Sequence, residues 1–429
     1  MSDTARAAEV LRRCREISRC TEVPGAITRG YLSEPMHVVH RLLREWMSAA
    51  GMEVRVDAAG NLRGLRRTSN PGARRLLLGS HLDTVPDAGA FDGVFGVVLA
   101  IAAVEALGTL ADLPLPYEIE VIGFAEEEGV CFGKPFLGSL ALGGQLDLAT
   151  LARSDRHGIT VAERLRAFGG NPDNLSDALL AANTAAYIEA HIEQGPVLDT
   201  AGEPLAVVTS IVGQSRLLFR FCGQANHAGT TPMHLRRDPV AAAAEWIVAI
   251  ERLASEISGL AATTGQIRAH PGAVNVIAGE VEATLDVRHE TDLTRESFVR
   301  SAIDSAREIA ARRCITVDAQ LQSRQSSMRM DGALVSQLRS AAEEAVGAPV
   351  RTMPSGAGHD AMILARSVPS AMLFVRSPGG ISHHPDEDVL LEDTAAALRT
   401  LDAFLHRFGK TGTLGSPDIF GGNGSDAHA

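Results

Sequence analysis

The pattern of apolar and polar positions predicts an α/β fold. Residues 34–50 carry apolar side chains at helical spacing, and 117–124 alternates as a β-strand does. A helix of small apolar residues, 94–107, stands between the strand-like segments 74–79 and 117–124. Strand, helix and strand in this order predict a βαβ unit and a mixed, mostly parallel sheet. Further elements are expected at 4–19, 53–56 and 61–65.

The pattern changes near residue 210 and changes back after about residue 324. Between these points the expected strands and helices follow a β-α-β-β-α order, which is typical of a small α+β domain. We therefore expect a smaller α+β domain, 210–327, inserted into a larger α/β domain made of 1–209 and 328–429. The expected elements after residue 210 are 216–222, 239–257, 273–276, 281–288, 298–312, 335–346, 371–375 and 391–408. The Gly-rich tail, 421–429, is expected to be disordered.

Composition and charge exclude several classes of protein. The 429 residues include 40 Lys and Arg against 52 Asp and Glu, and a net charge of −12 disfavours nucleic acid as a partner. The 45% apolar fraction is too high for a disordered chain, and the longest apolar run, 94–107, is too short to span a membrane. The chain has no secretory signal and its five scattered cysteines include no C-x-x-C pair, so we expect reduced thiols and a cytoplasmic location.

Candidate chemistry begins where an apolar strand runs into His81-Leu-Asp83. Residues two apart share one face of a strand, so His81 can bind a metal while Asp83 holds its ring in one tautomer. For so short a motif, a satisfied histidine and a capping aspartate remain the alternative. Asp92 precedes the helix 94–107, where it is either a metal ligand or the residue that caps the helix.

Three adjacent carboxylates, Glu126, Glu127 and Glu128, follow the strand 117–124. Neighbouring carboxylates raise one another's pKa unless a cation neutralises them, although an acidic turn in solvent would also explain the run. Binding sites in open α/β sheets form at the carboxyl ends of strands, which favours a metal ligand beside a general base. His191 and His383 also follow apolar runs.

Together these positions offer three imidazoles and two carboxylates: His81, Asp92, Glu127, His191 and His383. Zn²⁺ and Mn²⁺ accept such ligands, and five of them, one able to bridge, suit two divalent metal ions. Such a site delivers hydroxide to a carbonyl or amide carbon, with Glu126 moving the proton. Competing motifs are absent, since the chain has no H-E-x-x-H, no P-C-x-x-C to accompany the H-x-E at His191, and no G-x-S-x-G.

Seven ordered motifs resemble the M20 metallopeptidase clan, and within it the hydantoinase/carbamoylase branch. They are G-S-H-L-D-T-V-P, F-D-G-V-F-G, A-E-E-E-G, H-I-E-Q-G-P-V-L, N-H-A-G-T-T-P-M-x-x-R-R-D, S-G-A-G-H-D-A-M and G-G-I-S-H-H-P-D-E, within about Gly25 to Phe408. The resemblance implies that His81 and His191 bind one metal ion and that Glu127 and His383 bind the other. It further implies that Asp92 bridges the ions, Glu126 is the general base and Asp83 orients His81.

The inserted domain resembles the family's lid, which also mediates dimerisation, so a homodimer is implied. The resemblance implies that His227 polarises the substrate carbonyl across the dimer, although the residues alone favour a turn histidine. Arg288 would grip a substrate carboxylate through two parallel hydrogen bonds, with a surface salt bridge as the alternative. The other substrate-binding candidates are Gln194, Asn275, Gly356, Gly358 and His359, of which His359 is equally well explained as structural.

The resemblance implies an amidohydrolase that cleaves the carbamoyl C–N bond of a ureido acid and releases ammonia and carbon dioxide. Residues 27–33 and 373–380 resemble allantoate amidohydrolases, so allantoate is the leading substrate, and N-carbamoyl-L-amino acids or N-carbamoyl-β-alanine are the alternatives. Arg376 is either a contact for a second ureido arm or a loop residue. A dipeptidase or aminoacylase of the same clan and a non-catalytic binding protein also stay open; His191 disfavours the peptidase, and Glu126 with its ligand set disfavours the binding protein.

Overall fold

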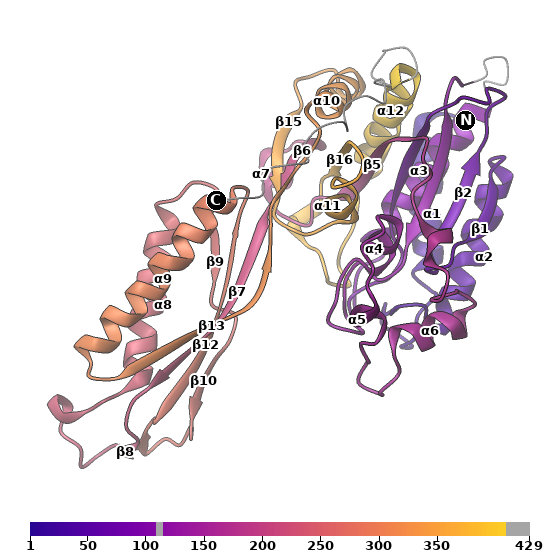
Figure 1. Cartoon of the computed structure of the whole chain (residues 1–429). Coiled ribbons are helices and arrows are strands. Elements are labelled where there is room, and N and C mark those ends of the chain that lie inside the picture. The colour runs from indigo at the N-terminus through magenta and orange to yellow at the C-terminus, as the bar shows by residue number, and fades with distance from the viewer. Residues whose placement is uncertain (109–114, 409–429) are drawn as a thin grey trace, which may run out of the picture. The chain divides into compact units, whose positions relative to one another are not determined.

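The computed structural model describes residues 1–108 and 115–408 (Figure 1), and the Gly-rich tail 421–429 lies outside them. The chain divides into two compact units. The first consists of 1–209, 330–353 and the residues from His359 onwards, and the second of 210–329 and 354–358. Among the described residues, every helix is too short or too polar to cross a membrane.

The first unit is built on a mixed sheet whose centre is parallel, which confirms the predicted α/β class. The strand order is β1-β2-β4-β3-β5-β16-β6-β14, and β15 also pairs with β6. Strands β4, β3, β5 and β16 run parallel to one another, whereas β1, β2 and β6 pair antiparallel with their neighbours. The strands are β1 (Glu53–Val56), β2 (Leu62–Arg66), β3 (Arg75–His81), β4 (Glu118–Phe124), β5 (Thr184–Ile192), β6 (Leu205–Ile211), β15 (Arg351–Ser355) and β16 (Ser370–Val375). The division into units passes along this sheet, so that β14 (Met328–Arg329) is counted with the second unit.

Helix α3 (Val94–Gly108) is buried along most of its length and packs directly on the sheet. A Cβ atom on Gly96 would lie 2.1 Å from the carbonyl oxygen of Ala190, so only glycine permits this approach to β5. The close packing brings the loop before α3, which carries Asp92, towards the end of β5. The unit's other helices are α1 (Asp3–Ile17), α2 (Glu34–Ala49), α4 (Leu137–Leu142), α5 (Leu148–Leu151), α6 (Val161–Phe168), α7 (Val197–Ala201), α10 (Gly332–Val346), α11 (Asp360–Leu364) and α12 (Leu391–Phe408), with 3-10 turns at Leu175–Ala178 and Pro378–Gly380.

The second unit is a smaller α+β layer, in which two helices cover one face of an antiparallel sheet (Figure 1). The sheet order is β10-β12-β7-β13, with β9 paired to β12 and a separate β8–β11 pair. Trp246 anchors the core, where its ring contacts Phe219 at 4.3 Å and Phe221 at 5.7 Å between centroids. The elements are β7 (Gly213–Cys222), β8 (Asn226–His227), α8 (Pro239–Ser255), β9 (Ala261–Thr263), β10 (Ile267–His270), β11 (Val276–Ile277), β12 (Glu280–His289), α9 (Asp292–Arg312) and β13 (Thr316–Gln325), with a 3-10 turn at Met233–Leu235.

We expect a buried imidazole on α2, that of His40, to make the fold sensitive to acid. The ring of His40 meets the edge of Phe168 at 5.1 Å between centroids, and its Nδ1 has no hydrogen-bond partner among the described residues. Burial lowers the pKa of His40 to about 3. Below the ordinary histidine pKa of 6.5 the unfolded chain therefore binds a proton that the folded chain refuses. We expect this group to lower the free energy of unfolding by about 1.4 kcal/mol per unit as the pH falls from about 6.5 towards 3.

Urea unfolding at several pH values between 5 and 7.5 checks this expectation. We expect His40→Gln to show a shallower dependence of stability on pH than the wild-type chain. His37→Gln is the matched control. His37 also contacts Phe168, with 4.1 Å between the ring centroids, but it is exposed. Equal slopes for the wild-type chain and His40→Gln would contradict the prediction.

Candidate metal centre

The predicted metal ligands lie at the carboxyl ends of neighbouring parallel strands. His81 is the last residue of β3, and Glu126 to Glu128 follow β4. His191 lies near the end of β5, opposite Phe374 of β16, and His383 follows β16. Because parallel strands end at the same edge of a sheet, segments far apart in the sequence meet there.

The imidazoles of His81 and His191 direct lone pairs at each other. Their Nδ1 atoms lie 3.0 Å and 2.9 Å from the main-chain oxygens of Asp83 and Ile192. A carbonyl oxygen only accepts hydrogen bonds, so each Nδ1 carries the proton and each Nε2 of the neutral rings bears a lone pair. These Nε2 atoms are 3.4 Å apart, and they lie 3.6 Å and 3.3 Å from Oδ1 of Asp92. Three electron-rich atoms thus converge, which is an arrangement that a divalent cation stabilises.

The pKa values of the side chains in this cluster are shifted by burial and by the charges of their neighbours. Burial lowers the pKa of His191 to about 4, which keeps it a neutral ligand. Burial also lowers the pKa of His81, but the nearby carboxylates of Asp83 and Asp92 raise it well above its usual value overall. Burial, reinforced by the negative charge of Asp92, raises the pKa of Glu128 to about 8. A cation beside these groups would offset the cost of keeping their carboxylates charged.

Asp92 has the geometry of a bridging ligand. Its carboxylate is 1% exposed, and its two oxygens face different imidazoles. Oδ1 faces His81 and His191, whereas Oδ2 lies 3.2 Å from Nε2 of His383. Gln194 spans the two sides, since its Nε2 lies 3.1 Å from Oδ1 of Asp92 and 3.3 Å from Nε2 of His383.

The three adjacent glutamates occupy different places. Potential ligand atoms of Asp92, Glu128 and His383 lie within 4.8 Å of one another, and so do those of His81, Glu127 and Glu128. Glu126 joins no such cluster among the described residues, and its Oε1 instead accepts the main-chain N–H of Cys131 at 3.0 Å. Burial, reinforced by the charge of Asp83, raises the pKa of Glu126 to about 8. The geometry therefore favours Glu128 over Glu127 as the partner of Asp92 and His383.

Which glutamate of the run faces which other side chain depends on the course of the backbone, and three identical residues in a row leave this open to sequence reasoning. The backbone turns directly after β4, because Glu126 has a positive φ of 54°. This turn sets the direction of each glutamate side chain. The resemblance assigns Glu126 as general base and Glu127 as ligand; these roles stay predictions, and Glu128 is the candidate that the geometry adds.

Asp83 orients its neighbours through two sets of atoms. Its carboxylate oxygens accept the main-chain N–H groups of Glu127 at 2.9 Å and Glu128 at 3.1 Å. The group closest to Nδ1 of His81 is the Asp83 carbonyl oxygen at 3.0 Å, while the carboxylate stands 3.6 Å away. Asp83 thus fixes both His81 and the turn that carries the glutamates.

Three further residues of the first unit, His359, Arg376 and His384, stand in different relations to the cluster. The buried ring of His359 packs against His191 at 4.5 Å between centroids, and burial lowers its pKa well below the usual value. Arg376 is held in two hydrogen bonds of 2.7 Å and 2.9 Å by Asp393, which explains it as a residue that fixes its loop. The exposed His384 accepts the N–H of Asp386 through Nδ1 and belongs to no ligand cluster of the described residues.

The second unit contains the remaining candidates. His227 is exposed in β8, and its Nδ1 accepts the N–H groups of Gly229 at 3.0 Å and Thr230 at 3.1 Å. In the neutral ring the proton therefore sits on Nε2, which is free to donate to a carbonyl oxygen. The side chain of Asn275 is exposed, and its main-chain oxygen accepts the N–H of Ala228. Gly358 belongs to the short segment 354–358 of this unit.

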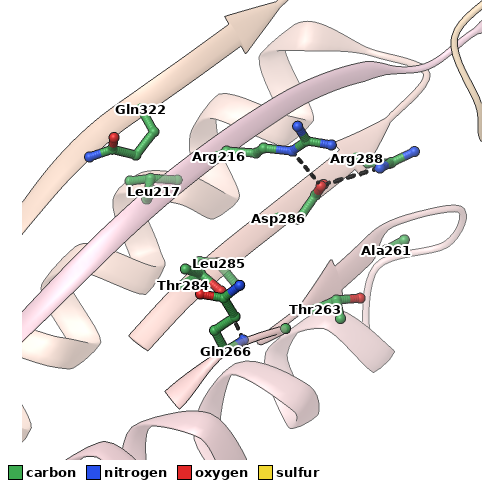
Figure 2. Close-up of a pocket in the computed structure, with 11 residues that line it drawn as sticks. Arg216, Leu217, Ala261, Thr263, Gln266, Thr284, Leu285, Asp286, Arg288 and Gln322 are labelled. Atoms are coloured by element: carbon green, nitrogen blue, oxygen red, sulfur yellow. Dashed lines mark hydrogen bonds and ion pairs between the residues drawn. The ribbon is translucent and has the colours of Figure 1, made fainter. Parts of the chain in front are cut away.

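Arg288 lines a cavity of about 560 Å³ on the open face of the second unit's sheet (Figure 2). Its guanidinium donates to the carboxylate of Asp286 at 3.1 Å and 3.2 Å and to the carbonyl oxygen of Gly356 at 2.8 Å. Arg216 approaches the same Asp286 carboxylate at 3.0 Å, as Figure 2 shows. This cavity belongs wholly to the second unit, whereas the metal-ligand candidates all belong to the first.

Comparisons with known proteins give consistent results. The family model of peptidase family M20/M25/M40 matches residues 77–407. The chain is 40% identical to "Allantoate deiminase 1" of Glycine max, covering 92% of this chain and 88% of that protein. It is 38% identical to "N-carbamoyl-L-amino acid amidohydrolase" of Geobacillus stearothermophilus, covering 88% and 92%. The crystal structure of a hydantoinase/carbamoylase family amidase from Burkholderia ambifaria matches with a TM-score of 0.86 and 35% identity, covering 94% and 97%.

Proposed function

This chain belongs to peptidase family M20/M25/M40, and we propose that it is an amidohydrolase that cleaves the carbamoyl C–N bond of a ureido acid, with allantoate as the leading substrate. Two kinds of relative support this reading, one named for allantoate and one for N-carbamoyl-L-amino acids. The observation that carries the hydrolytic function is the convergence of two imidazole lone pairs and the Asp92 carboxylate. The alternative substrates are N-carbamoyl-L-amino acids and N-carbamoyl-β-alanine.

We propose that the first unit is the catalytic domain and that its cluster holds two divalent metal ions, Zn²⁺ or Mn²⁺. His81 and His191 would bind one ion, Glu128 and His383 the other, and Asp92 both. When bound, the ions would activate water and polarise the carbamoyl carbonyl. This proposal moves the ligand role from Glu127 to Glu128.

The neighbouring side chains would then handle the proton and the substrate. Glu127 lies beside His81 and Glu128, and its backbone is fixed by Asp83, so it is placed to take a proton from the attacking water. It would return that proton to the departing nitrogen as the C–N bond breaks. The carbamic acid that leaves decomposes to ammonia and carbon dioxide, and the remaining product is an amine. Gln194, Asn275, Gly356, Gly358 and His359 stay predicted substrate contacts.

A panel of substrates tests the reaction. Metal-free protein is reloaded with Mn²⁺ or Zn²⁺ and given allantoate, several N-carbamoyl-L-amino acids, N-carbamoyl-β-alanine and a dipeptide. Ammonia release from allantoate alone is the expected result. A preference for carbamoyl amino acids would keep the chemistry and replace the substrate. Amine release from the dipeptide would favour a peptidase, and no turnover by protein that holds metal would contradict the proposed function.

We expect Arg288→Met to raise KM for the ureido acid by about 10- to 100-fold with a smaller change in kcat. A hydrogen bond to a charged group contributes about 1.5–3 kcal/mol, and its loss weakens the grip on the substrate carboxylate. The control is Arg216→Met, which removes the other guanidinium beside Asp286. An unchanged KM in Arg288→Met, or an equal rise in both variants, would contradict the assignment of Arg288 as the anchor.

We propose that the working form is a homodimer, in which the second unit serves as lid and dimerisation domain and the partner subunit supplies His227. The protonated Nε2 of His227 supports a role as donor to the substrate carbonyl. Sedimentation would show the dimer, and mixing two inactive variants, His227→Ala and Glu127→Gln, would restore activity only if the histidine acts across it. All five cysteines are free, which supports the proposal of a reducing, cytoplasmic location that cell fractionation can test.

A further inference from the structure

A buried carboxylate outside the proposed ligand set connects two of the loops that carry ligands. Oε1 of Glu387 accepts the main-chain N–H groups of Phe91 and Asp92, each at 3.0 Å. Its Oε2 accepts the hydroxyl of Ser382 at 3.0 Å, and the residue is only 4% exposed. Three donors from two loops therefore meet on this one carboxyl group.

The loop before α3 is shaped to admit this carboxylate. A Cβ atom on Gly89 would lie 2.3 Å from Cβ and 2.4 Å from Oε1 of Glu387, so any other residue at position 89 would displace the glutamate. On the other side, Ser382 directly precedes His383, and the main-chain N–H of Glu387 donates to the carbonyl oxygen of His384 at 3.0 Å. Glu387 is therefore fixed from both loops at once.

We propose that Glu387 is a positioning residue that holds the Asp92 loop against the His383 loop and so sets the spacing of these two ligands. The spacing concerned is the 3.2 Å between Oδ2 of Asp92 and Nε2 of His383. Glu387 acts through the main chain of Asp92 and through Ser382, and it belongs to none of the ligand clusters of the described residues. The inference rests on the proposed function, because it takes Asp92 and His383 to be metal ligands. Outer partners of this kind typically change metal affinity by about 10- to 100-fold when they are lost.

Metal binding, measured apart from catalysis, tests the proposal. Metal-free wild-type and variant proteins are titrated with Co²⁺ against a chelating dye, and the visible spectrum of the bound Co²⁺ is recorded. We expect Glu387→Ala to weaken binding of the second Co²⁺ ion by about 10- to 100-fold and to alter the spectrum. Glu387→Gln is expected to restore most of the affinity, because its amide oxygen still accepts two N–H groups and its amide nitrogen can donate to Ser382. Asp388→Ala removes the adjacent, half-exposed carboxylate and serves as the control.

The outcomes separate positioning from simple support of the fold. Unchanged Co²⁺ affinity and spectrum in Glu387→Ala, whatever its melting temperature, would overturn the proposal. If Glu387→Ala does not fold, Ser382→Ala replaces it as the test, because this variant removes one of the three hydrogen bonds. We expect Ser382→Ala to weaken binding of the second Co²⁺ ion measurably. Unchanged binding of that ion would overturn the proposal. Wild-type protein that binds fewer than two Co²⁺ ions, or that hydrolyses no ureido acid, would instead count against the proposed function.

Discussion

Glu127→Gln is expected to lower kcat for ureido hydrolysis by about 10²–10⁴-fold while leaving the metal content unchanged. Loss of a general base costs a factor of this size, because the amide has the shape of the carboxylate but cannot take the proton. The measurement is kcat for ammonia release together with the metal content of each purified variant. Glu128 belongs to both candidate clusters that include a glutamate of the run, and it is the proposed ligand, so the Gln variant at position 127 should keep its metal ions.

Glu126→Gln is the matched control for this prediction. Its amide oxygen still accepts the main-chain N–H of Cys131, so the variant should fold and retain most of its activity. The opposite result, with Glu126→Gln inactive and Glu127→Gln active, would return the base to the position that the sequence motif implied. The two variants differ by one residue in the chain, so they test the register of the glutamate run directly.

Asp92→Asn is expected to lose both metal ions and activity together. Each Asp92 oxygen faces a different set of imidazoles, so neutralising this one carboxylate weakens both proposed sites. The loss of affinity should exceed the roughly 10- to 100-fold that removal of an outer partner costs, because Asp92 itself is the proposed bridge. Metal content after dialysis and ammonia release from the reloaded protein are the measurements.

Asp87→Asn provides the comparison for Asp92→Asn. Asp87 is an exposed carboxylate in the same loop and belongs to no ligand cluster of the described residues. Its replacement changes the charge of the chain equally, and it should leave metal content and activity unchanged. Asp92→Asn protein that retains both ions after dialysis would show that the carboxylate does not bridge them.

The elements that the sequence predicted well include ones with many buried apolar residues. The helix expected at 391–408 is α12, and the strand expected at 117–124 is β4, shorter by one residue. Strands with little burial escaped prediction: β10 is exposed throughout and β13 is mostly exposed, so neither shows the alternation of apolar residues by which a strand is recognised. The strand expected at 273–276 is reduced to the two residues of β11.

The residue pattern alone was enough to predict an α/β protein with candidate metal ligands at strand ends, and to indicate which family its motifs resemble. These features are local, because residue type and the periodicity of strands and helices are properties of contiguous segments. Three features became visible only in the folded chain: which oxygen of Asp92 faces which imidazole, the proximity of Glu128 to His383, and the connection of two loops by Glu387. They could not be predicted because strand register, the turn at Glu126 and the close approach of α3 to β5 bring together atoms from segments far apart in the chain.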